Sequence, residues 1–174
     1  MNDPAFRPPS TAHDGRLSYA VFQLARVHRG HAAAMLRAMN LHPGQELLLM
    51  QLFDRDGQTQ SELLEAVGLD HSTVSKSLRR MQDAGLLTRE PSAHDRRVMV
   101  VRLTDAGRAL REPIADMWRT LEEISVRGLT ADQIETFTAS AYAIGQSIRD
   151  HDRQVPTDQT DRTDRTDQTD QTDQ

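Results

Sequence analysis

Apolar residues in the N-terminal part of the chain recur at alternating spacings of four and three positions. This rhythm places their side chains along one face of a helix, which we expect over residues 15–40. The seam consists of Leu17, Val21, Leu24, His28, His31 and Met35. A heptad-like seam of this kind is suited to packing against another long helix. The preceding residues, 1–14, are rich in proline and are expected to form a disordered arm.

The same spacing returns in the C-terminal half of the chain. Thr104 can cap a helix that runs to about Val126, and Pro113 should bend this helix or leave a local gap in its hydrogen bonds. Thr130 can cap a last helix. The apolar positions of these helices are Leu110, Ile114, Met117, Leu121, Ile124, Ile134, Phe137, Ala141, Ile144 and Ile148. Because three long seams exceed what one small domain can cover, the pattern predicts an interlocked homodimer.

The middle of the chain is predicted to hold shorter helices separated by turns. Pro43 suits the first turn of a helix that runs to about Asp54. The residues of this helix expected to be largely buried are Leu47, Leu48, Met50 and Leu52. Thr59 and Glu62 then fit a capping box at the start of a second helix, and Gly68 suits a tight turn at its end.

A third short helix is expected over Ser72–Ala84, capped by Asp70 and stopped by Gly85. Its apolar positions are Val74, Leu78 and Met81. Two short helices joined by a glycine-containing turn form the helix-turn-helix pattern. The polar positions on the rest of the third helix are Ser72, Thr73, Ser75, Lys76, Arg79 and Arg80. Such hydroxyls and cations suit contact with base edges and phosphates in the major groove; the alternative is an ordinary solvated face.

A β-hairpin is predicted after this helix. Leu86 and Leu87 open one strand, and the return strand is marked by Val98, Val100, Val101 and Leu103. The polar tip between them consists of Pro91, Ser92, Ala93, His94, Asp95, Arg96 and Arg97. A basic hairpin beside a helix-turn-helix can lie along the minor groove, where an arginine senses groove width. Asp95 is close enough in sequence to orient Arg97. The alternative is an ordinary charged loop.

The distribution of charge matters more here than its total. The net charge of −5 argues at first against a nucleic-acid partner. However, residues 71–111 hold nine Lys or Arg and four Asp or Glu, a local charge of +5. Residues 151–174 hold seven Asp and three Arg, a local charge of −4. Because binding follows local rather than total charge, the cationic stretch remains suited to DNA.

Composition excludes several classes of protein. With 37% hydrophobic and 4% aromatic residues in 174 positions, we expect one domain with an aliphatic, mostly helical core. No apolar run is long enough to span a membrane, and the N-terminus lacks an apolar signal segment. The absence of cysteine excludes disulfides and fits a cytoplasmic location. Neither a nucleophile beside a base nor a full metal-ligand set is evident, so we expect no enzyme, metal or cofactor.

Taken together, the motifs resemble the multiple-antibiotic-resistance regulator (MarR) family of winged helix-turn-helix transcriptional regulators. The resemblance covers residues 41–110, and more loosely 17–148. The matching residues are Thr59-Gln60-Ser61-Glu62-Leu63, Ser72-Thr73-Val74-Ser75, Gly85-Leu86-Leu87, Asp95-Arg96-Arg97 and Leu103-Thr104-Asp105-Ala106-Gly107. An Asp-x-Arg wing followed by Leu-Thr-x-x-Gly is quite specific to this family.

The resemblance implies a mainly α fold with a small β-hairpin wing. Within a domain over 15–149, it implies a winged helix-turn-helix unit at 43–103 and long dimerisation helices at 15–40 and 104–149. In such proteins the Ser/Thr-rich helix enters the major groove, and the wing arginine, here Arg97, enters the minor groove. The expected DNA contacts are Ser61, Ser72, Thr73, Ser75, Lys76, Arg79, Arg80, His94, Asp95, Arg96 and Arg97.

The family resemblance also implies a repressor that a small phenolic or lipophilic effector releases from a near-palindromic operator. The effector would lie between the dimer helices and the DNA-binding unit. Residues placed there by position are His28, His31, Met35, Arg55 and Trp118. For the two histidines, a locally bonded core position and a metal site remain as alternatives. A constitutive or architectural DNA-binding protein without ligand control is the alternative function.

The C-terminal tail has a composition of its own. From Thr157 onward it consists of six Thr-Asp-Gln or Thr-Asp-Arg triplets without an apolar residue. Such a segment cannot bury any surface in a core, so residues 150–174 are expected to be disordered.

Overall fold

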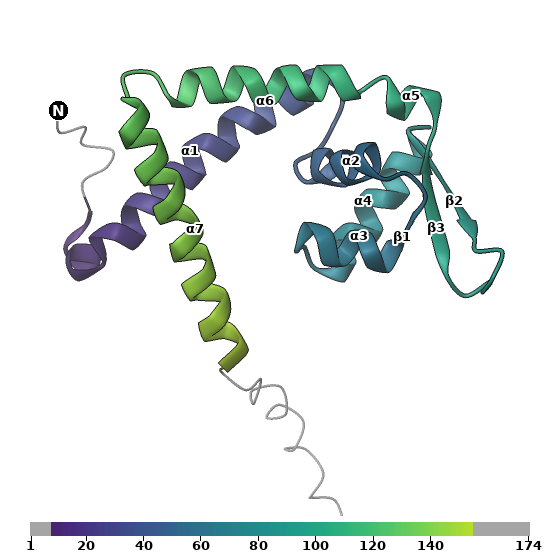
Figure 1. Ribbon diagram of the computed structural model, residues 1–174, viewed down its shortest axis with the longest axis horizontal. Coiled ribbons are helices and arrows are strands. Elements are labelled where there is room, and N and C mark those ends of the chain that lie inside the picture. Colours follow the sequence, from purple (N-terminus) through teal and green to yellow (C-terminus); the bar gives the residue numbers. More distant parts are fainter. Residues whose placement is uncertain (1–7, 155–174) are drawn as a thin grey trace, which may run out of the picture. The chain divides into compact units, whose positions relative to one another are not determined.

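The computed structural model describes residues 8–154 and confirms the predicted mainly helical fold with a small β-hairpin (Figure 1). The expectations for residues 1–7 and 155–174 lie outside the described residues. The chain divides into two units, of which the first ends at Ser125 and the second begins at Val126. No helix of the described residues is long and apolar enough to cross a membrane.

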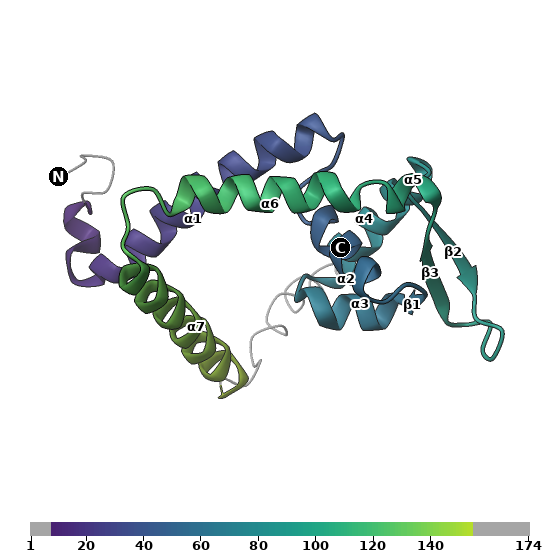
Figure 2. The ribbon, with the colours of Figure 1, turned by 45° about the horizontal axis from the view of Figure 1, so that its top comes forward.

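The first unit contains both helices and strands. They are the 3₁₀ helix η2 (Ser10–Gly15), α1 (Arg16–Ala38), α2 (Gln45–Asp54), β1 (Gln58–Thr59), α3 (Gln60–Val67), α4 (His71–Asp83), β2 (Leu87–Pro91), β3 (Met99–Leu103), α5 (Asp105–Arg108) and α6 (Arg111–Ser125). The second unit contains α7 (Ala131–Gln154). Within the first unit, Figures 1 and 2 show the β2–β3 hairpin projecting beside the cluster of α2, α3 and α4.

A leucine-rich core joins α2, α3, α4 and the hairpin to the adjoining parts of α1 and α6. It consists of Leu36, Leu41, Leu48, Leu49, Leu52, Leu63, Val74, Leu78, Met81, Leu87, Val101, Leu103, Ile114 and Met117. The expected apolar stripe of α4 is therefore confirmed as buried. In α2, by contrast, Leu47 and Met50 are only half-buried, while Leu49 is buried.

The sheet has three antiparallel strands in the order β1-β3-β2. The hairpin pairs Leu87 with Leu103 at its base and Pro91 with Met99 near its tip. Strand β1 was not predicted; it is only two residues long and pairs Gln58 with Val101. Its Gln58 side chain is buried and its Nε2 donates to the carbonyl oxygens of Gln51 (2.7 Å) and Arg55 (2.6 Å). These bonds attach the sheet to the end of α2.

Helix α2 begins two residues later than expected. Pro43 lies in the turn before the helix, because Gly44 at the N-cap has a left-handed φ of 92°, which interrupts any helical run from Pro43. The Gly44 amide donates to Oε2 of Glu46 at 2.7 Å. Burial of the Glu46 side chain raises the pKa of its carboxyl group above the usual value.

The prediction of a single helix from Thr104 to Val126 is wrong, because this segment forms two helices, α5 and α6. Thr104 does cap α5, with its Oγ1 accepting from the Gly107 amide at 3.1 Å. Pro113 lacks an amide hydrogen and could not donate to the carbonyl of Ala109 in a continuous helix. It instead occupies the first turn of α6, where amide hydrogens need no partner within the helix.

The close approach of α5 to the hairpin explains the glycine of the Leu-Thr-x-x-Gly motif. A Cβ atom on Gly107 would lie 2.0 Å from the carbonyl oxygen of Leu86. That oxygen also accepts from the Thr104 amide at 3.1 Å, and Oγ1 of Thr104 donates to the Gly85 carbonyl at 2.6 Å. Only glycine fits at position 107 while these contacts are kept.

The N-terminal helix begins close to the expected position, but its seam is not covered within the first unit. Leu17, Val21 and Leu24 are exposed by 63%, 42% and 41%. The expected disorder of residues 1–14 is wrong for residues 10–14, which form the helix η2 together with Gly15. Here the Ala12 amide donates to the Pro9 carbonyl at 2.9 Å.

In the second unit, the predicted Thr130 cap is confirmed. Its Oγ1 accepts from the Gln133 amide at 3.3 Å, while Oε1 of Gln133 accepts from the Thr130 amide at 2.9 Å. On α7, Phe137 and Ile148 are exposed within this unit. The helix continues to Gln154, so disorder is wrong for residues 150–154. The Asp150 carboxylate there accepts from Gln146 one turn earlier and pairs with a following arginine, which supports the last turns.

Candidate nucleic-acid interface

The helix expected to enter the major groove is α4. Its position is set by its own N-cap, by the capped helix α3 before it and by the tight turn between them. Oγ1 of Thr59 accepts from the Glu62 amide at 3.2 Å, and Oε2 of Glu62 accepts from the Thr59 amide at 2.7 Å. Gly68 has a left-handed φ of 62°, and Oδ1 of Asp70 accepts from the Thr73 amide at 2.9 Å. The predicted capping box, turn and N-cap are thus confirmed. Helix α4 begins at His71, one residue before the expected start.

Both capping carboxylates are strongly acidic. Hydrogen bonds from the Thr59 backbone and side chain, together with Arg55, lower the pKa of Glu62 to about 2. Bonds from the Thr73 and Ser72 side chains hold the pKa of Asp70 well below its usual value. Both carboxyl groups have a lower pKa in the folded state than in the unfolded state. Their ionised forms therefore stabilise the fold fully at a pH above the unfolded-state pKa, and this stabilisation is lost as the pH falls toward the folded-state pKa. The caps are therefore ionised at neutral pH.

The solvent-facing side of α4 carries the predicted groove-binding residues. Lys76, Arg79 and Arg80 are exposed, and among residues 8–154 no ion pair engages any of them. Thr73 and Ser75 are half-buried beside them. This face has free cationic donors along the helix and smaller hydroxyl groups nearer its start, as contact with phosphates and base edges requires.

The hydroxyl group of Ser72 has fewer free hydrogen-bonding positions than an unengaged serine. Its Oγ donates to Oδ1 of Asp70 at 2.7 Å, so its hydroxyl hydrogen is already engaged. In this arrangement Oγ can accept from a base amino group, such as N4 of cytosine or N6 of adenine. A phosphate oxygen, which only accepts hydrogen bonds, is not a suitable partner for it.

The tip of the hairpin is exposed and held by its own backbone. The Ser92 amide donates to the Val98 carbonyl at 2.8 Å, and the Val98 amide donates to the Asp95 carbonyl at 2.9 Å. Oδ1 of Asp95 accepts from the backbone amide of Arg97 at 2.9 Å. Asp95 therefore shapes the turn that carries Arg97, and no ion pair between these two side chains occurs in the described part of the chain. His94 and Arg96 are also exposed at the tip.

Arg97 lies where the hairpin meets the two short helices. It lines a hollow of about 260 Å³ together with Ser61 at the start of α3 and His71 at the start of α4. Gln60 also lines this hollow. Neither His71 nor Gln60 was among the expected DNA contacts. Their positions beside the capping residues Asp70 and Thr59 are the signal that could have identified them.

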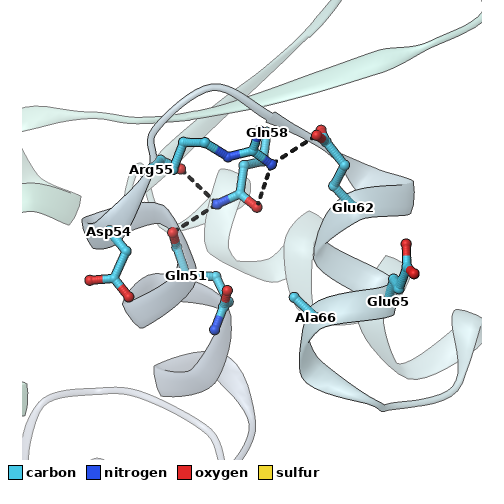
Figure 3. A pocket seen from close by; sticks show the side chains of 7 residues that line it. All are labelled: Gln51, Asp54, Arg55, Gln58, Glu62, Glu65 and Ala66. Carbon is cyan, nitrogen blue, oxygen red and sulfur yellow. Dashed lines mark hydrogen bonds and ion pairs between the residues drawn. The ribbon is translucent and has the colours of Figure 1, made fainter.

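Of the five residues suggested for an effector site, Arg55 lies apart from the others in the part of the chain that the structure describes. Arg55 lines a polar pocket of about 380 Å³ between α2 and α3, where its Nη2 pairs with Oε1 of Glu62 at 2.8 Å (Figure 3). The remaining lining residues are Gln51, Asp54, Gln58, Glu65 and Ala66. None of the four other suggested residues lines this pocket.

Those four residues lie on α1 and α6. His28 is half-buried, His31 is exposed, and Met35 packs against the core. Trp118 lies at the surface with its Nε1 at 3.2 Å from Sδ of Met50. Among residues 8–154, no group of three or more His, Cys, Asp or Glu side chains is arranged to hold a metal ion.

Comparisons with known proteins agree with this geometry. Residues 32–98 match the model of the MarR family. The organic hydroperoxide resistance transcriptional regulator of Bacillus subtilis is 24% identical over 135 residues, which are 78% of this chain and 90% of that protein.

Two solved structures show the same fold. One is a mutant MarR from E. coli complexed with operator DNA, with a TM-score of 0.71, 20% identity and coverage of 79% of this chain and 99% of that chain. The other is the PcaV transcriptional regulator from Streptomyces coelicolor with its natural ligand, with a TM-score of 0.66, 23% identity and coverage of 82% and 98%.

Proposed function

The chain belongs to the MarR family of transcriptional regulators, and from this premise we propose how it works. It is a regulator and not an enzyme. We propose that two copies bind a near-palindromic operator, repress transcription in the cytoplasm, and leave the DNA when a small phenolic or lipophilic effector binds. The proposal rests on one observation about α4. Its apolar stripe is buried, whereas Lys76, Arg79 and Arg80 on its other face are exposed and form no ion pair among residues 8–154.

The proposed DNA-binding unit is 43–103, in which α4 enters the major groove and the hairpin lies along the minor groove. Lys76, Arg79 and Arg80 would meet phosphates or guanine, while Ser72 would accept from a base amino group. Ser61, Thr73, Ser75, His94 and Arg96 would add contacts at the start of the helices and at the hairpin tip. The match to a protein solved on operator DNA supports this arrangement.

The cationic face of α4 should give binding a measurable dependence on salt. Arg80→Ala is expected to reduce the slope of log affinity against log salt concentration by about one unit, because each phosphate contact releases about one counterion. Arg149→Ala on α7 is a matched control that should leave the slope unchanged. Fluorescence anisotropy at several salt concentrations measures both variants. An unchanged slope for Arg80→Ala would remove this residue from the phosphate contacts.

The proposed dimer uses the helices at 15–40 and 104–149. Leu17, Val21 and Phe22 on α1 are exposed, as is Phe137 on α7, and apolar residues repeated along a helix are normally covered by a partner. A second copy of the chain is the proposed cover, which agrees with the homodimers of this family.

The dimer has a direct test in solution. Light scattering at micromolar concentration should give about twice the chain mass of 19.6 kDa. The physical reason is that the free energy of burying these apolar seams favours association. A mass of one chain, together with tight binding to an operator, would contradict the proposal.

The proposed effector site includes His28, His31, Met35, Arg55 and Trp118. The similar structure of PcaV with its natural ligand supports control by a small molecule. Arg55 already pairs with Glu62, and the other four residues lie on α1 and α6. We propose that a second chain completes the site.

His28 is the most informative residue for this site because it is half-buried on α1. His28→Ala is expected to leave operator affinity nearly unchanged but to raise the effector concentration needed for release by about tenfold, the effect of one lost hydrogen bond. Operator release by a panel of small phenols measures this, with Arg26→Ala on the same helix as control. Loss of thermal stability without a selective change in release would assign His28 to packing instead.

A further inference from the structure

The hollow beside Arg97 lies between the two elements that are proposed to enter the grooves of DNA. It is lined by residues of α3, by the first residue of α4 and by the segment that leads from the hairpin tip into β3. Pairing of Thr59 with Val100 fastens the start of α3 to β3, so the fold itself holds the walls of the hollow together. The full lining is Thr59, Gln60, Ser61, Leu64, His71, Arg97, Val98 and Met99.

The sugar-phosphate backbone of DNA is the part of a duplex that would pass this hollow. In B-DNA a backbone strand separates the major groove from the minor groove. With α4 in the major groove and the hairpin in the minor groove, this strand crosses the surface between the two elements. His71 at the start of α4 and Arg97 beside the hairpin tip both line the hollow on that surface. A phosphate group is therefore the part of the DNA that would lie nearest His71.

The charges around the hollow suit an anion. Arg97 carries a permanent positive charge, and none of the eight lining residues is acidic. The carboxylates next in sequence are engaged, since Asp70 accepts from the Ser72 hydroxyl at 2.7 Å and Asp95 accepts from the Arg97 amide at 2.9 Å. Among residues 8–154, no ion pair engages His71 or Arg97. A phosphate would thus meet the exposed imidazole of His71 without a competing carboxylate in the lining.

The groups around His71 determine how its charge responds to DNA. The Arg97 guanidinium on the hairpin opposes protonation of the imidazole, whereas the neighbouring Asp70 carboxylate favours it. Helix α3 brings no charged side chain to the hollow, because Glu62 and Glu65 line the pocket between α2 and α3 instead. A DNA phosphate adds a negative charge and offsets that of Arg97. The protonated form of His71 is therefore favoured more strongly in the complex than in the free chain.

We propose that His71 takes up a proton when the chain binds DNA and that its charged imidazole holds the backbone phosphate between the groove of α4 and the minor groove entered by Arg97. The charged imidazole has two N–H donors, whereas the neutral one has a single donor. Because the complex then holds more protons than the free chain, affinity for DNA rises as the pH falls through the range in which histidine ordinarily titrates, about pH 8 to about pH 5. This proposal rests on the proposed function and adds pH control to it.

The pH dependence is measured by fluorescence anisotropy with a labelled duplex cut from a genomic fragment that the purified chain retains. The unchanged chain is expected to bind about fivefold or more tightly at about pH 6 than at about pH 8, because a hydrogen bond from a charged group stabilises a complex roughly tenfold more than a neutral one. His71→Gln keeps an N–H donor but cannot gain charge, so this ratio should fall below about twofold. His71→Lys, which stays charged, should restore tight binding at about pH 8.

Two further histidines serve as controls. His151→Gln on α7 replaces an exposed histidine outside the proposed DNA-binding unit and should keep the full ratio. His94→Gln separates a contribution from the hairpin tip, where a second exposed histidine lies. Loss of the ratio in His94→Gln together with its retention in His71→Gln would place the proton at the tip and overturn the proposal.

The phosphate is identified on the DNA itself, which does not depend on any variant. Duplexes that each carry one uncharged methylphosphonate are compared at the two pH values. At one position in each half-site the pH ratio of the unchanged chain should be lost, and there His71→Gln should cause no further loss of affinity. If no position removes the ratio, or if His71→Gln retains it, His71 is not the proton-linked contact and the proposed function still stands. A chain that binds no duplex at any pH would refute the proposed function and this inference with it.

Discussion

Gly107→Ala is expected to lower the free energy of unfolding by about 3 kcal/mol, at the upper end of the cost of overpacking. The added Cβ would lie 2.0 Å from the carbonyl oxygen of Leu86. That oxygen cannot move away easily, because it accepts from the Thr104 amide and the neighbouring Gly85 carbonyl accepts from the Thr104 hydroxyl. The clash must therefore separate α5 from the base of the hairpin.

Urea denaturation followed by circular dichroism measures this loss. Gly30→Ala is the matched control: it lies inside α1, is exposed, and has no atom within 4 Å of an added Cβ. It should raise stability by about 0.5–1 kcal/mol, since alanine favours the helix more than glycine does. If Gly107→Ala were within about 0.5 kcal/mol of the unchanged chain, the described contact between α5 and the hairpin would be wrong.

Arg97→Ala is expected to weaken operator binding by about 1–3 kcal/mol, the scale of a good specific contact. Arg97 follows an exposed hairpin tip and is the residue that the family resemblance places in the minor groove. A narrow, A·T-rich minor groove concentrates negative potential. The loss should therefore be larger for operators with A·T-rich flanks than for those with G·C-rich flanks.

Asp95→Ala should give a smaller loss of the same kind. In the structure Asp95 accepts from the backbone amide of Arg97, so its removal loosens the turn without removing the cation. Titration of both variants and the unchanged chain against operators with exchanged flanks measures the two effects. Arg149→Ala on α7 serves as the control for loss of one charge. If Arg97→Ala bound every flank as tightly as the unchanged chain, the hairpin would not be a DNA contact.

The parts of the fold that could be predicted are those encoded by neighbouring residues. The capping box of Thr59 and Glu62, the turn at Gly68 and the cap at Asp70 depend on contacts within three residues. The buried stripe of α4 follows from helical spacing alone. Such local signals agree with the final structure because the core imposes no competing demand on them.

The parts that could not be predicted depend on contacts between distant segments. Strand β1 consists of the polar residues Gln58 and Thr59, which form a strand because they pair with β3. The break between α5 and α6 combines the effect of Pro113 with the close approach of Gly107 to Leu86. Neither contact is visible in the spacing of apolar residues.

The candidate sites were likewise predictable where they depend on neighbouring residues and not where they depend on contacts between distant segments. The cationic face of α4 was identified by its residue types, and the structure leaves it exposed. The role of Asp95 was only partly predicted, since spacing places it near Arg97 but does not say that it accepts from the backbone. A further pocket, at Arg108 and Arg111, was not predicted, because it draws on α2, β3, α5 and α6, and its residues Phe53 and Arg111 are 58 positions apart.

Sequencing the genomic DNA fragments that the purified chain retains tests whether a dimer of this chain reads a specific operator. The expected result is a common near-palindromic sequence whose half-sites are about one helical turn apart, on the order of 34 Å. Competition with unrelated DNA should remove the other fragments, because binding through phosphates alone does not distinguish sequences. Retention of fragments without any shared sequence, or of none at all, would show that the chain does not read a specific operator.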